Sequence, residues 1–485
     1  MSGTRELFCG IDVGTQSTKA VLVDVDAGEV VARASEAYDL IEGLPPGHAE
    51  QQPEMWLDAA KKVVREVGHG EEIAGIGVSG QQHGAVLLGE DFGVLRAAKL
   101  WCDTSAADEA AGLSKRLGRV VPAGFTGPKL RWIADREPEI WDRTAHVLLP
   151  HDFLDACLTH ELYTEVGDAS GTGYLAVDEG AYDADAMAAT APGLAERVPP
   201  LVACDRVAGT LVPRVAEEFG LRPGTPVSAG GGDNMMSAIG AGATRPGVAV
   251  CSLGTSGTVF AFADAPVTDP DGAIASFRAS SPIPGGGGAG WLPLLCVMNC
   301  TEPLEALVAL TGKDHAALTV EAERVAMGDE LFVPFLVGER VPNLPRATGT
   351  LDGLRLGSLT PGVLYRAALE GVTLNLAAGL ERMRAIGVRP DEVRLVGGAA
   401  RNPLWQRLLA TVFGVPVRVL AETETAAVGA ALQAAAAVRS APVDDLAQAF
   451  VRYESEPVPP GDDAAERDRL DRLARRLAEA SATEA

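Results

Sequence analysis

Apolar residues near the N-terminus fall into short, β-branched runs that are separated by turn residues. Residues 7–35, LFCGIDVGTQSTKAVLVDVDAGEVVARAS, contain three such runs, divided by a Gly-Thr turn and an Asp-Ala-Gly turn. Runs of this length and composition, bounded by turn residues, are typical of β-strands. The pattern predicts that the chain opens with three strands in a β-meander.

The same strand pattern returns about half the chain later. Residues 251–264, CSLGTSGTVFAFAD, match residues 11–24, IDVGTQSTKAVLVD, as a strand, a Gly-Thr turn, a polar pair, a threonine and an apolar strand. The two turns are 240 residues apart in a chain of 485. Self-similarity at a fixed offset indicates an internal duplication. We therefore predict two related lobes, over residues 1–245 and 246–485.

Strand and helix patterns alternate through the rest of the chain. Residues 73–80 form an apolar strand pattern, and residues 104–118 form a capped helix pattern. A long amphipathic helix is predicted over residues 361–387, and residues 392–414 fit a strand, a glycine turn and a helix. Alternation of this kind is typical of sheets covered by helices, so the predicted fold class is α/β.

Composition restricts the class of protein. Hydrophobic residues make up 47% of the chain and charged residues 22%, which is typical of a folded globular protein. The 41 Lys and Arg residues are outnumbered by 66 Asp and Glu residues, for a net charge of −25 without a visible basic cluster. Such a charge repels nucleic acid and anionic membranes, so neither is an expected partner. An anionic ligand must be held by backbone amides, a bound cation or a few well-placed donors.

The sequence contains no recognisable targeting or membrane-spanning segment. The start of the chain lacks an apolar leader, and the alanine-rich stretch 426–438 is shorter than the roughly 20 residues that a membrane helix requires. The seven cysteines include no C-x-x-C pair, which argues against a disulfide framework and against zinc. A cytoplasmic location is therefore expected.

The two Gly-Thr turns are candidates for phosphate binding. Glycine lets the backbone turn tightly, so that the following amides point outward as a concave array of donors. One such turn alone is more often an ordinary hairpin, but two of them, one from each predicted lobe, can clamp a polyphosphate. The residues are Gly14, Thr15 and Gln16 in the first hairpin and Gly254, Thr255 and Ser256 in the second.

A third glycine turn lies in LVGGAARNPLWQRLL, residues 395–409. Gly397 and Gly398 end an apolar strand just before a helix, which permits close approach of the backbone to a flat or phosphorylated ligand. This turn lacks the G-x-G-x-x-G pattern of dinucleotide-binding folds, and the chain has no G-x-x-x-x-G-K-[ST] pattern of a P-loop.

One carboxylate stands out in AGGGDNMMSAIG, residues 229–240, where Asp233 follows three glycines and precedes a helix pattern. Asp is among the best residues for capping a helix, so capping is one interpretation. Three glycines are unnecessary for a cap, but they let a ligand approach the backbone closely. The pattern therefore favours a functional carboxylate, and capping is compatible with that role.

Six stretches between residues 8 and 437 together resemble the FGGY carbohydrate kinases. In chain order they are GIDVGTQSTKAVLVD, GQQHGAVLL, GFTGPKLRW, GGGDN, SLGTSGTVF and LVGGAARNPLWQRLLATVFGVPV. The resemblance implies an actin-like, ribonuclease H-like fold of two lobes, with ATP and Mg²⁺ in a central cleft. It implies transfer of a phosphoryl group to a terminal sugar hydroxyl, with D-xylulose as the expected acceptor and Asp233 as the general base. It also leads us to expect a homodimer.

The resemblance further implies roles for single residues. Asp12 is expected to orient Mg²⁺ or its waters together with Asp233, and a structural turn aspartate is the alternative. Asn234, Gln82 and His83 are expected to hydrogen-bond the sugar, although a lone histidine is more often structural.

Two other segments receive roles in the same way. Trp101 and Asp103 are expected to line the sugar pocket, with a buried core tryptophan as the alternative. Many relatives carry Asn directly after this Trp and Arg shortly beyond the Asp, whereas this chain has Cys102 and Ser105, which leaves the identity of the sugar open. Next to the nucleotide, the resemblance places three residues of the third glycine turn, namely Gly397, Gly398 and Asn402.

Other functions remain open from the sequence. Ribulose, gluconate and glycerol are alternative acceptors for a kinase of this kind. Actin-like chaperones and filament proteins carry similar phosphate hairpins, but no separate peptide-binding domain follows the second lobe here. A sugar sensor that has lost catalysis is a third alternative. The presence of both Asp12 and Asp233 argues against it.

Overall fold

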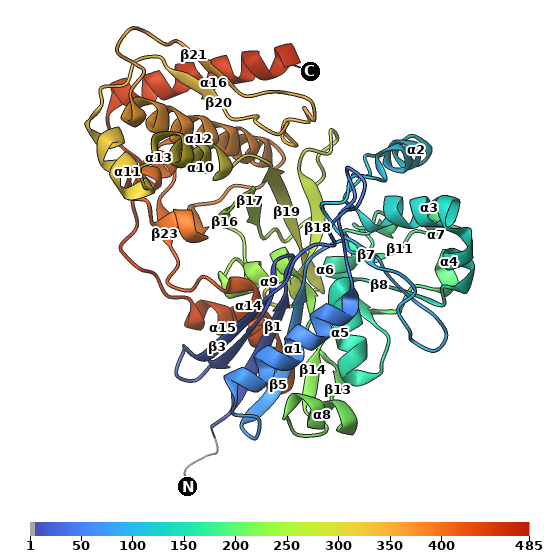
Figure 1. Ribbon diagram of the computed structural model, residues 1–485. Coiled ribbons are helices and arrows are strands. Elements are labelled where there is room, and N and C mark those ends of the chain that lie inside the picture. Colours follow the sequence, from blue (N-terminus) through green and yellow to red (C-terminus); the bar gives the residue numbers. More distant parts are fainter. Residues whose placement is uncertain (1–4, 485) are drawn as a thin grey trace.

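Residues 5–484 are described by a computed structural model, which contains two large β-sheets with helices packed on them (Figure 1). The first sheet has the order β13 (Val207–Thr210), β14 (Pro226–Ser228), β5 (Ile73–Gly80), β1 (Leu7–Val13), β2 (Ser17–Asp24) and β3 (Glu29–Ala37), and β15 (Gly231–Gly232) also pairs with β5. The second has the order β18 (Ala275–Pro282), β19 (Ala289–Val297), β17 (Gly257–Ala261), β16 (Val248–Leu253), β22 (Glu392–Val396) and β23 (Val417–Val419).

The two sheets are built on the same plan. β1 pairs with β2 in the antiparallel direction and with β5 in the parallel direction, and β16 pairs with β17 and β22 in the same two ways. The Gly-Thr turns found in the sequence join β1 to β2 and β16 to β17. The predicted duplication of an α/β unit is therefore confirmed, while its division between residues 245 and 246 stays a prediction.

Helices and short strand pairs complete the fold. Before the second sheet the helices are α1 (Pro53–Val67), α2 (Ala107–Leu117), α3 (Thr126–Arg136), α4 (Pro138–Arg143), α5 (Pro150–Thr159), α6 (Val166–Ala169), α7 (Ala184–Thr190), α8 (Pro213–Phe219) and α9 (Asp233–Gly240). After β16 they are α10 (Glu302–Thr311), α11 (His315–Arg324), α12 (Pro361–Ala385), α13 (Pro403–Phe413), α14 (Thr425–Arg439), α15 (Val443–Phe450) and α16 (Ala464–Glu484). The short pairs are β4 (Glu50–Gln51) with β7 (Ala98–Lys99), β6 (Val86–Leu88) with β8 (His146–Leu148), β9 (Thr164–Glu165) with β12 (Leu201–Val202), β10 (Leu175–Ala176) with β11 (Ala181–Tyr182), and β20 (Leu331–Val333) with β21 (Thr350–Asp352).

The predicted helices are present, with small differences at their ends. α2 begins at Ala107 rather than at residue 104, and the residue before it, Ala106, makes no capping hydrogen bond, so the expected cap is absent. α12 ends at Ala385, two residues before the glycine that was expected to end it. Residues 392–414 form a strand, a glycine turn and a helix, as predicted.

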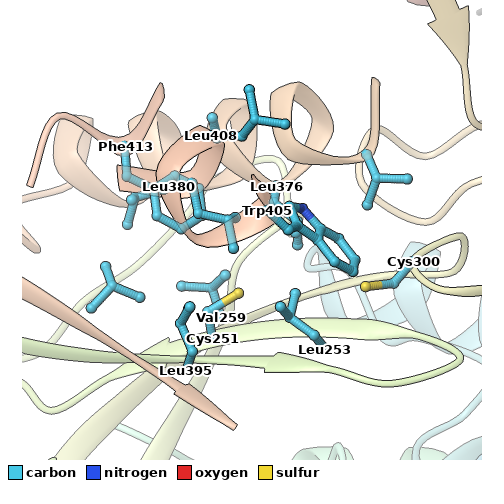
Figure 2. Packing of buried hydrophobic residues seen from close by; sticks show 14 of the residues in the cluster. Cys251, Leu253, Val259, Cys300, Leu376, Leu380, Leu395, Trp405, Leu408 and Phe413 are labelled. Carbon is cyan, nitrogen blue, oxygen red and sulfur yellow. The ribbon is translucent and has the colours of Figure 1, made fainter. Parts of the chain in front are cut away.

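The largest hydrophobic core lies between the second sheet and the helices α12 and α13 (Figure 2). Trp405 of α13 is buried there among aliphatic side chains, and its indole N–H donates to the Thr373 hydroxyl at 2.9 Å. The thiols of Cys251 and Cys300 fill space on the sheet side of the same core. All seven cysteines have free thiols. This core holds β16 and β22, and with them two of the glycine turns, in fixed positions.

Helix α14 belongs to the C-terminal part of the chain but packs against β1 and β5 of the first sheet and against α9. Glycines make these contacts very close. A Cβ atom added at Gly10 of β1 would lie 1.8 Å from the Ala427 carbonyl oxygen, and one added at Gly429 would lie 1.8 Å from the Met236 carbonyl oxygen. The alanine-rich sequence of α14 therefore serves close helix packing. Within residues 5–484, neither α14 nor any other helix is long and apolar enough to cross a membrane.

We predict that Gly429→Ala lowers the free energy of unfolding by about 2 kcal/mol, because α14 and α9 must move apart to admit the methyl group. Gly112→Ala in α2 is the matched control, since an added Cβ there meets no atom within 4 Å. The control should stabilise by about 0.5 kcal/mol or more through helix propensity. Urea denaturation measures both, and equal midpoints for the two variants would contradict the packing argument.

Candidate active site

A cavity of about 360 Å³ lies between the two sheets and is lined by residues of both. From the N-terminal part of the chain come Asp12, Thr15, Lys19, Gln82, His83, Trp101, Asp233, Asn234 and Ser237. From the C-terminal part come Ser252, Ser256, Thr258, Cys296, Arg340, Gly397, Glu424 and Thr425, among others. The structure therefore brings together most of the residues that the sequence singled out, although they lie hundreds of positions apart.

Asp233 is the first residue of α9, at the wall of this cavity. It follows β15, whose two glycines pair with Ser79 and Gly80 at the end of β5. A Cβ added at Gly232 would lie 2.7 Å from Cγ of Gln82 and 2.9 Å from an oxygen of Asp168. The glycines are thus required by the close approach of neighbouring side chains.

Asp233 does not cap its own helix. The N-cap position is Gly232, and no side chain accepts a capping hydrogen bond there. The Asp233 carboxylate instead accepts hydrogen bonds from the backbone N–H of Asn234 at 2.7 Å and from the Asn234 side chain at 2.9 Å. The capping interpretation is therefore wrong, and the carboxylate is held by its neighbour at the cavity wall.

The electrostatic environment of Asp233 makes it a weak acid. Burial raises its pKa to about 7, and the charges of Asp12 and Asp168 add to the increase, whereas the hydrogen bonds from Asn234 oppose it. Burial also raises the pKa of Asp12, although the Ser79 hydroxyl donates to it at 2.7 Å and Lys19 lies nearby. Two carboxylates that repel each other across a cavity are a favourable place for a cation or a proton.

Gln82 and His83 follow the end of β5. The Gln82 side-chain oxygen accepts from the Asn234 amide at 2.9 Å, which ties the β5 turn to α9. The His83 ring packs against Phe125 and Phe277, with ring centroids 4.8 Å and 5.6 Å away. Burial, followed by the positive charges nearby, lowers the pKa of His83 well below its usual value, so the imidazole is neutral. A neutral imidazole and an amide are suited to hydrogen bonds with uncharged hydroxyl groups.

Trp101 lines the cavity and is tied to the first hairpin. Its indole N–H donates to the Thr15 hydroxyl at 2.9 Å, and that hydroxyl donates to the Gln81 side chain at 3.0 Å. The indole therefore lies beside the first Gly-Thr turn, at the wall of the cavity.

The structure does not bring Asp103 to the cavity. Its carboxylate is fully buried and accepts from the Ala49 backbone N–H at 3.0 Å, from the Lys99 ammonium at 3.1 Å and from the Ser105 hydroxyl. Asp103, His48 and Glu50 have ligand atoms close enough to hold a metal ion, but the ammonium of Lys99 contacts all three. In this arrangement Asp103 is part of a buried ionic cluster behind Trp101.

The tips of the two hairpins lie at the edge of the cavity. Gln16 and Thr255 are exposed, and neither they nor Gly14 line the cavity wall, whereas Thr15 and Ser256 do. The Gly14 carbonyl accepts from the Tyr38 hydroxyl at 2.7 Å, and the Thr255 carbonyl accepts from the Cys300 backbone N–H at 3.1 Å. Each turn is thus fixed from behind. The Gly14 N–H closes its hairpin by donating to the Ser17 carbonyl at 3.0 Å, which leaves the amides at the tips of the turns to face a ligand.

A second cavity, of about 660 Å³, lies beyond the second hairpin and includes Gly254, Gly398 and Asn402. Much of its wall is apolar or aromatic, with Tyr365 and Val320 among the side chains. A Cβ on Gly398 would meet no atom within 4 Å, so this glycine leaves space beside the cavity.

The two remaining residues of this turn have structural constraints of their own. A Cβ on Gly397 would lie 2.6 Å from the Leu253 carbonyl, so this glycine is required by strand packing. Asn402 caps α13 by accepting from the N–H groups of Leu404 and Trp405, and its amide donates to the Thr319 hydroxyl at 2.9 Å.

Several lining residues were missed by the sequence analysis. Lys19 pairs with Asp12 across the β1–β2 hairpin and forms a 2.6 Å ion pair with Glu424. The second copy of the repeat has Val259 at the position of Lys19. This charged residue in place of an apolar one could have identified Lys19 as a functional candidate. Arg340 lies in PFLVGERVPN, a stretch that resembles the family but suggested no role.

Comparisons with known proteins agree with this geometry. Residues 7–240 match the N-terminal domain of the FGGY family of carbohydrate kinases, and residues 249–438 match its C-terminal domain. The xylulose kinase of Haemophilus influenzae is 36% identical, covering 92% of this chain and 94% of its own length. The xylulose kinase of Streptomyces rubiginosus is 38% identical, covering 98% and 96%.

A solved structure is similar over almost the whole chain. The crystal structure of xylulose kinase from Rhodospirillum rubrum superimposes with a TM-score of 0.87 at 31% identity and covers 99% of both chains. The two matched domains are those whose sheets enclose the cavity. The chain therefore belongs to the FGGY family of carbohydrate kinases.

Proposed function

We propose that the protein transfers the γ-phosphoryl group of ATP to the terminal hydroxyl of D-xylulose, giving D-xylulose 5-phosphate. The observation that carries the proposal is the position of Asp233, a carboxylate with a pKa of about 7, in a cavity lined by both Gly-Thr hairpins. Relatives that match over nine tenths of the chain are xylulose kinases, which supports this acceptor.

The sugar would lie between Asp233 and the side chains of Gln82, His83, Trp101 and Asn234. Because His83 is neutral, it offers hydrogen bonds to the sugar without adding charge. In the reaction, the sugar hydroxyl oxygen bonds to the γ-phosphorus while the bond from that phosphorus to the β-phosphate oxygen breaks. The hydroxyl proton passes to the Asp233 carboxylate, and the electron pair of the broken bond leaves with ADP.

The nucleotide would extend from the first cavity into the second. Backbone amides of the two hairpins would hold the phosphates, because the glycines leave these amides unobstructed. The apolar wall beside Gly398 would hold the adenine ring, and Asn402 would fix the turn that contacts the adenosine.

The carboxylates at the cavity fit Mg²⁺, which prefers oxygen ligands and keeps several waters. Asp12 and Asp233 are the residues that would hold the ion, directly or through water, and their mutual repulsion is relieved by a cation. When bound, Mg²⁺ neutralises phosphate charge and orients the γ-phosphoryl group. Lys19 keeps its 2.6 Å ion pair with Glu424. The charge of Lys19 lowers the pKa of Asp12, and the charge of Glu424 raises it.

The function is tested by ADP release with D-xylulose, D-ribulose, L-ribulose, L-xylulose, glycerol and gluconate as acceptors. We expect kcat/KM to be at least about tenfold higher for D-xylulose than for any other acceptor, because each mismatched hydroxyl leaves a buried polar group unpaired. A higher value for another acceptor contradicts the substrate, and ADP release that no acceptor accelerates contradicts the kinase activity.

Replacing Asp233 by Ala should lower kcat by about 10² or more, because the hydroxyl proton loses its acceptor. The affinity for ATP should change little. Asp58→Ala is a suitable control, since Asp58 lies in α1 with 79% of its side chain exposed. Steady-state kinetics and calorimetric titration with an ATP analogue measure these effects. Turnover of the Asp233 variant within a few-fold of the wild type would rule out a general base.

The pKa of about 7 for Asp233 predicts the pH dependence of the rate. A general base must be ionised, so kcat/KM for the sugar should fall about tenfold per pH unit below pH 7 and level off above it. The pKa is raised, and protonation at low pH therefore removes the active form. A profile of kcat/KM between pH 5.5 and about 8.5 measures this, and a flat profile or a midpoint near that of an ordinary carboxyl, about 4, would contradict the assignment.

A further inference from the structure

Arg340 lies in the segment 334–343, PFLVGERVPN. Its backbone N–H donates a hydrogen bond to the side chain of the preceding residue, Glu339. The Glu339 carboxylate is buried and accepts from the backbone N–H groups of Met298 and Arg340, each at 2.7 Å, and from the Asn375 amide at 3.0 Å. Arg340 is thereby fastened to the end of β19 and to α12. The Glu339 oxygens accept from these amide donors and form no ion pair with the Arg340 guanidinium.

Arg340 lines the active-site cavity. Its positive charge contributes to lowering the pKa of His83, on the sugar side. It also interacts with the Cys296 thiol, which in turn interacts with the hydroxyl of Ser256 in the second hairpin. Although burial raises the pKa of Cys296, both contacts oppose that increase. Arg340 therefore lies close to the place where the phosphoryl group must pass from nucleotide to sugar.

Arg340 is the one cation at the cavity wall that has no carboxylate partner in the described residues, 5–484. The charged side chains of the wall are Asp12, Lys19, Asp233, Arg340 and Glu424. Lys19 is already paired with Glu424. Arg340 forms no ion pair within residues 5–484. A guanidinium has five donors and no acceptor, in a geometry that matches two oxygens of a phosphate at once. An unpaired guanidinium at the wall of an otherwise acidic cavity is suited to an anion.

We propose that Arg340 is a catalytic residue that contacts the phosphoryl group during its transfer. This inference rests on the proposed kinase function. As the oxygen–phosphorus bond to the sugar forms and the bond to ADP breaks, negative charge is shared among the phosphoryl oxygens, and Arg340 stabilises that charge. Arg340 keeps its own proton throughout, since the hydroxyl proton goes to Asp233. Its contribution is electrostatic and complements the backbone amides of the hairpins.

Arg340→Gln, Arg340→Lys and the control Arg346→Gln test the proposal. Arg346 lies a few residues beyond this segment, is exposed and does not line the cavity. We expect Arg340→Gln to lower kcat by about 10³, as for arginines that stabilise phosphoryl transfer elsewhere, with a smaller loss for Arg340→Lys. The sugar KM should stay within a few-fold of the wild type. ATP hydrolysis without sugar should fall by a similar factor to kcat, and Arg346→Gln should behave as the wild type.

Free guanidinium at sub-denaturing concentration provides a readout that a structural role would not move. It should restore part of the activity of Arg340→Gln but not of Asp233→Ala. An unchanged kcat with a raised sugar KM would overturn the proposal in favour of sugar binding. The proposal would also be overturned if both Arg340 variants lost activity together with a lower melting temperature and guanidinium did not restore that activity.

The same experiment separates this inference from the proposed function. If the wild type prefers an acceptor other than D-xylulose, the proposed substrate fails, but the ratio of variant to wild type with that acceptor still tests Arg340. Hydrolysis of ATP without any sugar gives a second test that does not depend on the acceptor. A normal rate of hydrolysis in Arg340→Gln would overturn the role of Arg340 whatever the acceptor is.

Discussion

The contact on which the site depends is the close packing of α14 between the first sheet and α9. Glycines at Gly10, Gly77, Gly240 and Gly429 let backbone approach backbone, because a Cβ at any of them would lie 2.0 Å or less from a carbonyl oxygen. α9 begins with Asp233, and the residues before and at the start of α14 line the same cavity. The position of the carboxylate is therefore set by the tertiary fold, through a helix that comes from the far end of the chain.

The second constraint is electrostatic. The chain carries a net charge of −25, and the cavity wall itself holds three carboxylates, yet its proposed substrate is a polyphosphate. Backbone amides at the two hairpins supply donors without adding side-chain charge. Lys19 is neutralised by Glu424, which leaves Arg340 and a bound cation to offset the phosphate charge. Burial, followed by the charges of Asp12 and Asp168, raises the pKa of Asp233 to about 7. A carboxylate with a pKa near the working pH is a more effective general base than an ordinary carboxylate.

Local features of the fold were predictable because short sequences encode them. The hairpins joining β1 to β2 and β16 to β17 follow from β-branched runs around Gly-Thr turns, and the duplication follows from their repetition. Asp233 was noticeable because three glycines precede it. Its capping interpretation failed because Gly232 occupies the N-cap position of α9. The glycines instead serve contacts with Gln82 and Asp168, which are remote in sequence.

Features that depend on distant partners were not predictable. Asp103 was expected at the sugar, but its burial with Lys99 and Glu50 depends on the pairing of β4 with β7. The position of Arg340 depends on the hydrogen bonds of Glu339 to Arg340 itself and to the residue after β19, which no local sequence pattern indicates. Membership of the FGGY carbohydrate kinases settles the choice between a kinase and an actin-like chaperone, which the hairpins alone left open.

The central claim is that one nucleotide is gripped by both hairpins while Asp233 faces the acceptor hydroxyl. A crystal structure of the protein with D-xylulose, Mg²⁺ and a non-hydrolysable ATP analogue tests it most directly. The account predicts that the triphosphate contacts the turns at Thr15 and Ser256 and that an Asp233 oxygen accepts a hydrogen bond from the terminal hydroxyl of the sugar. A triphosphate that touches only one turn, or a sugar bound out of reach of Asp233, would contradict it.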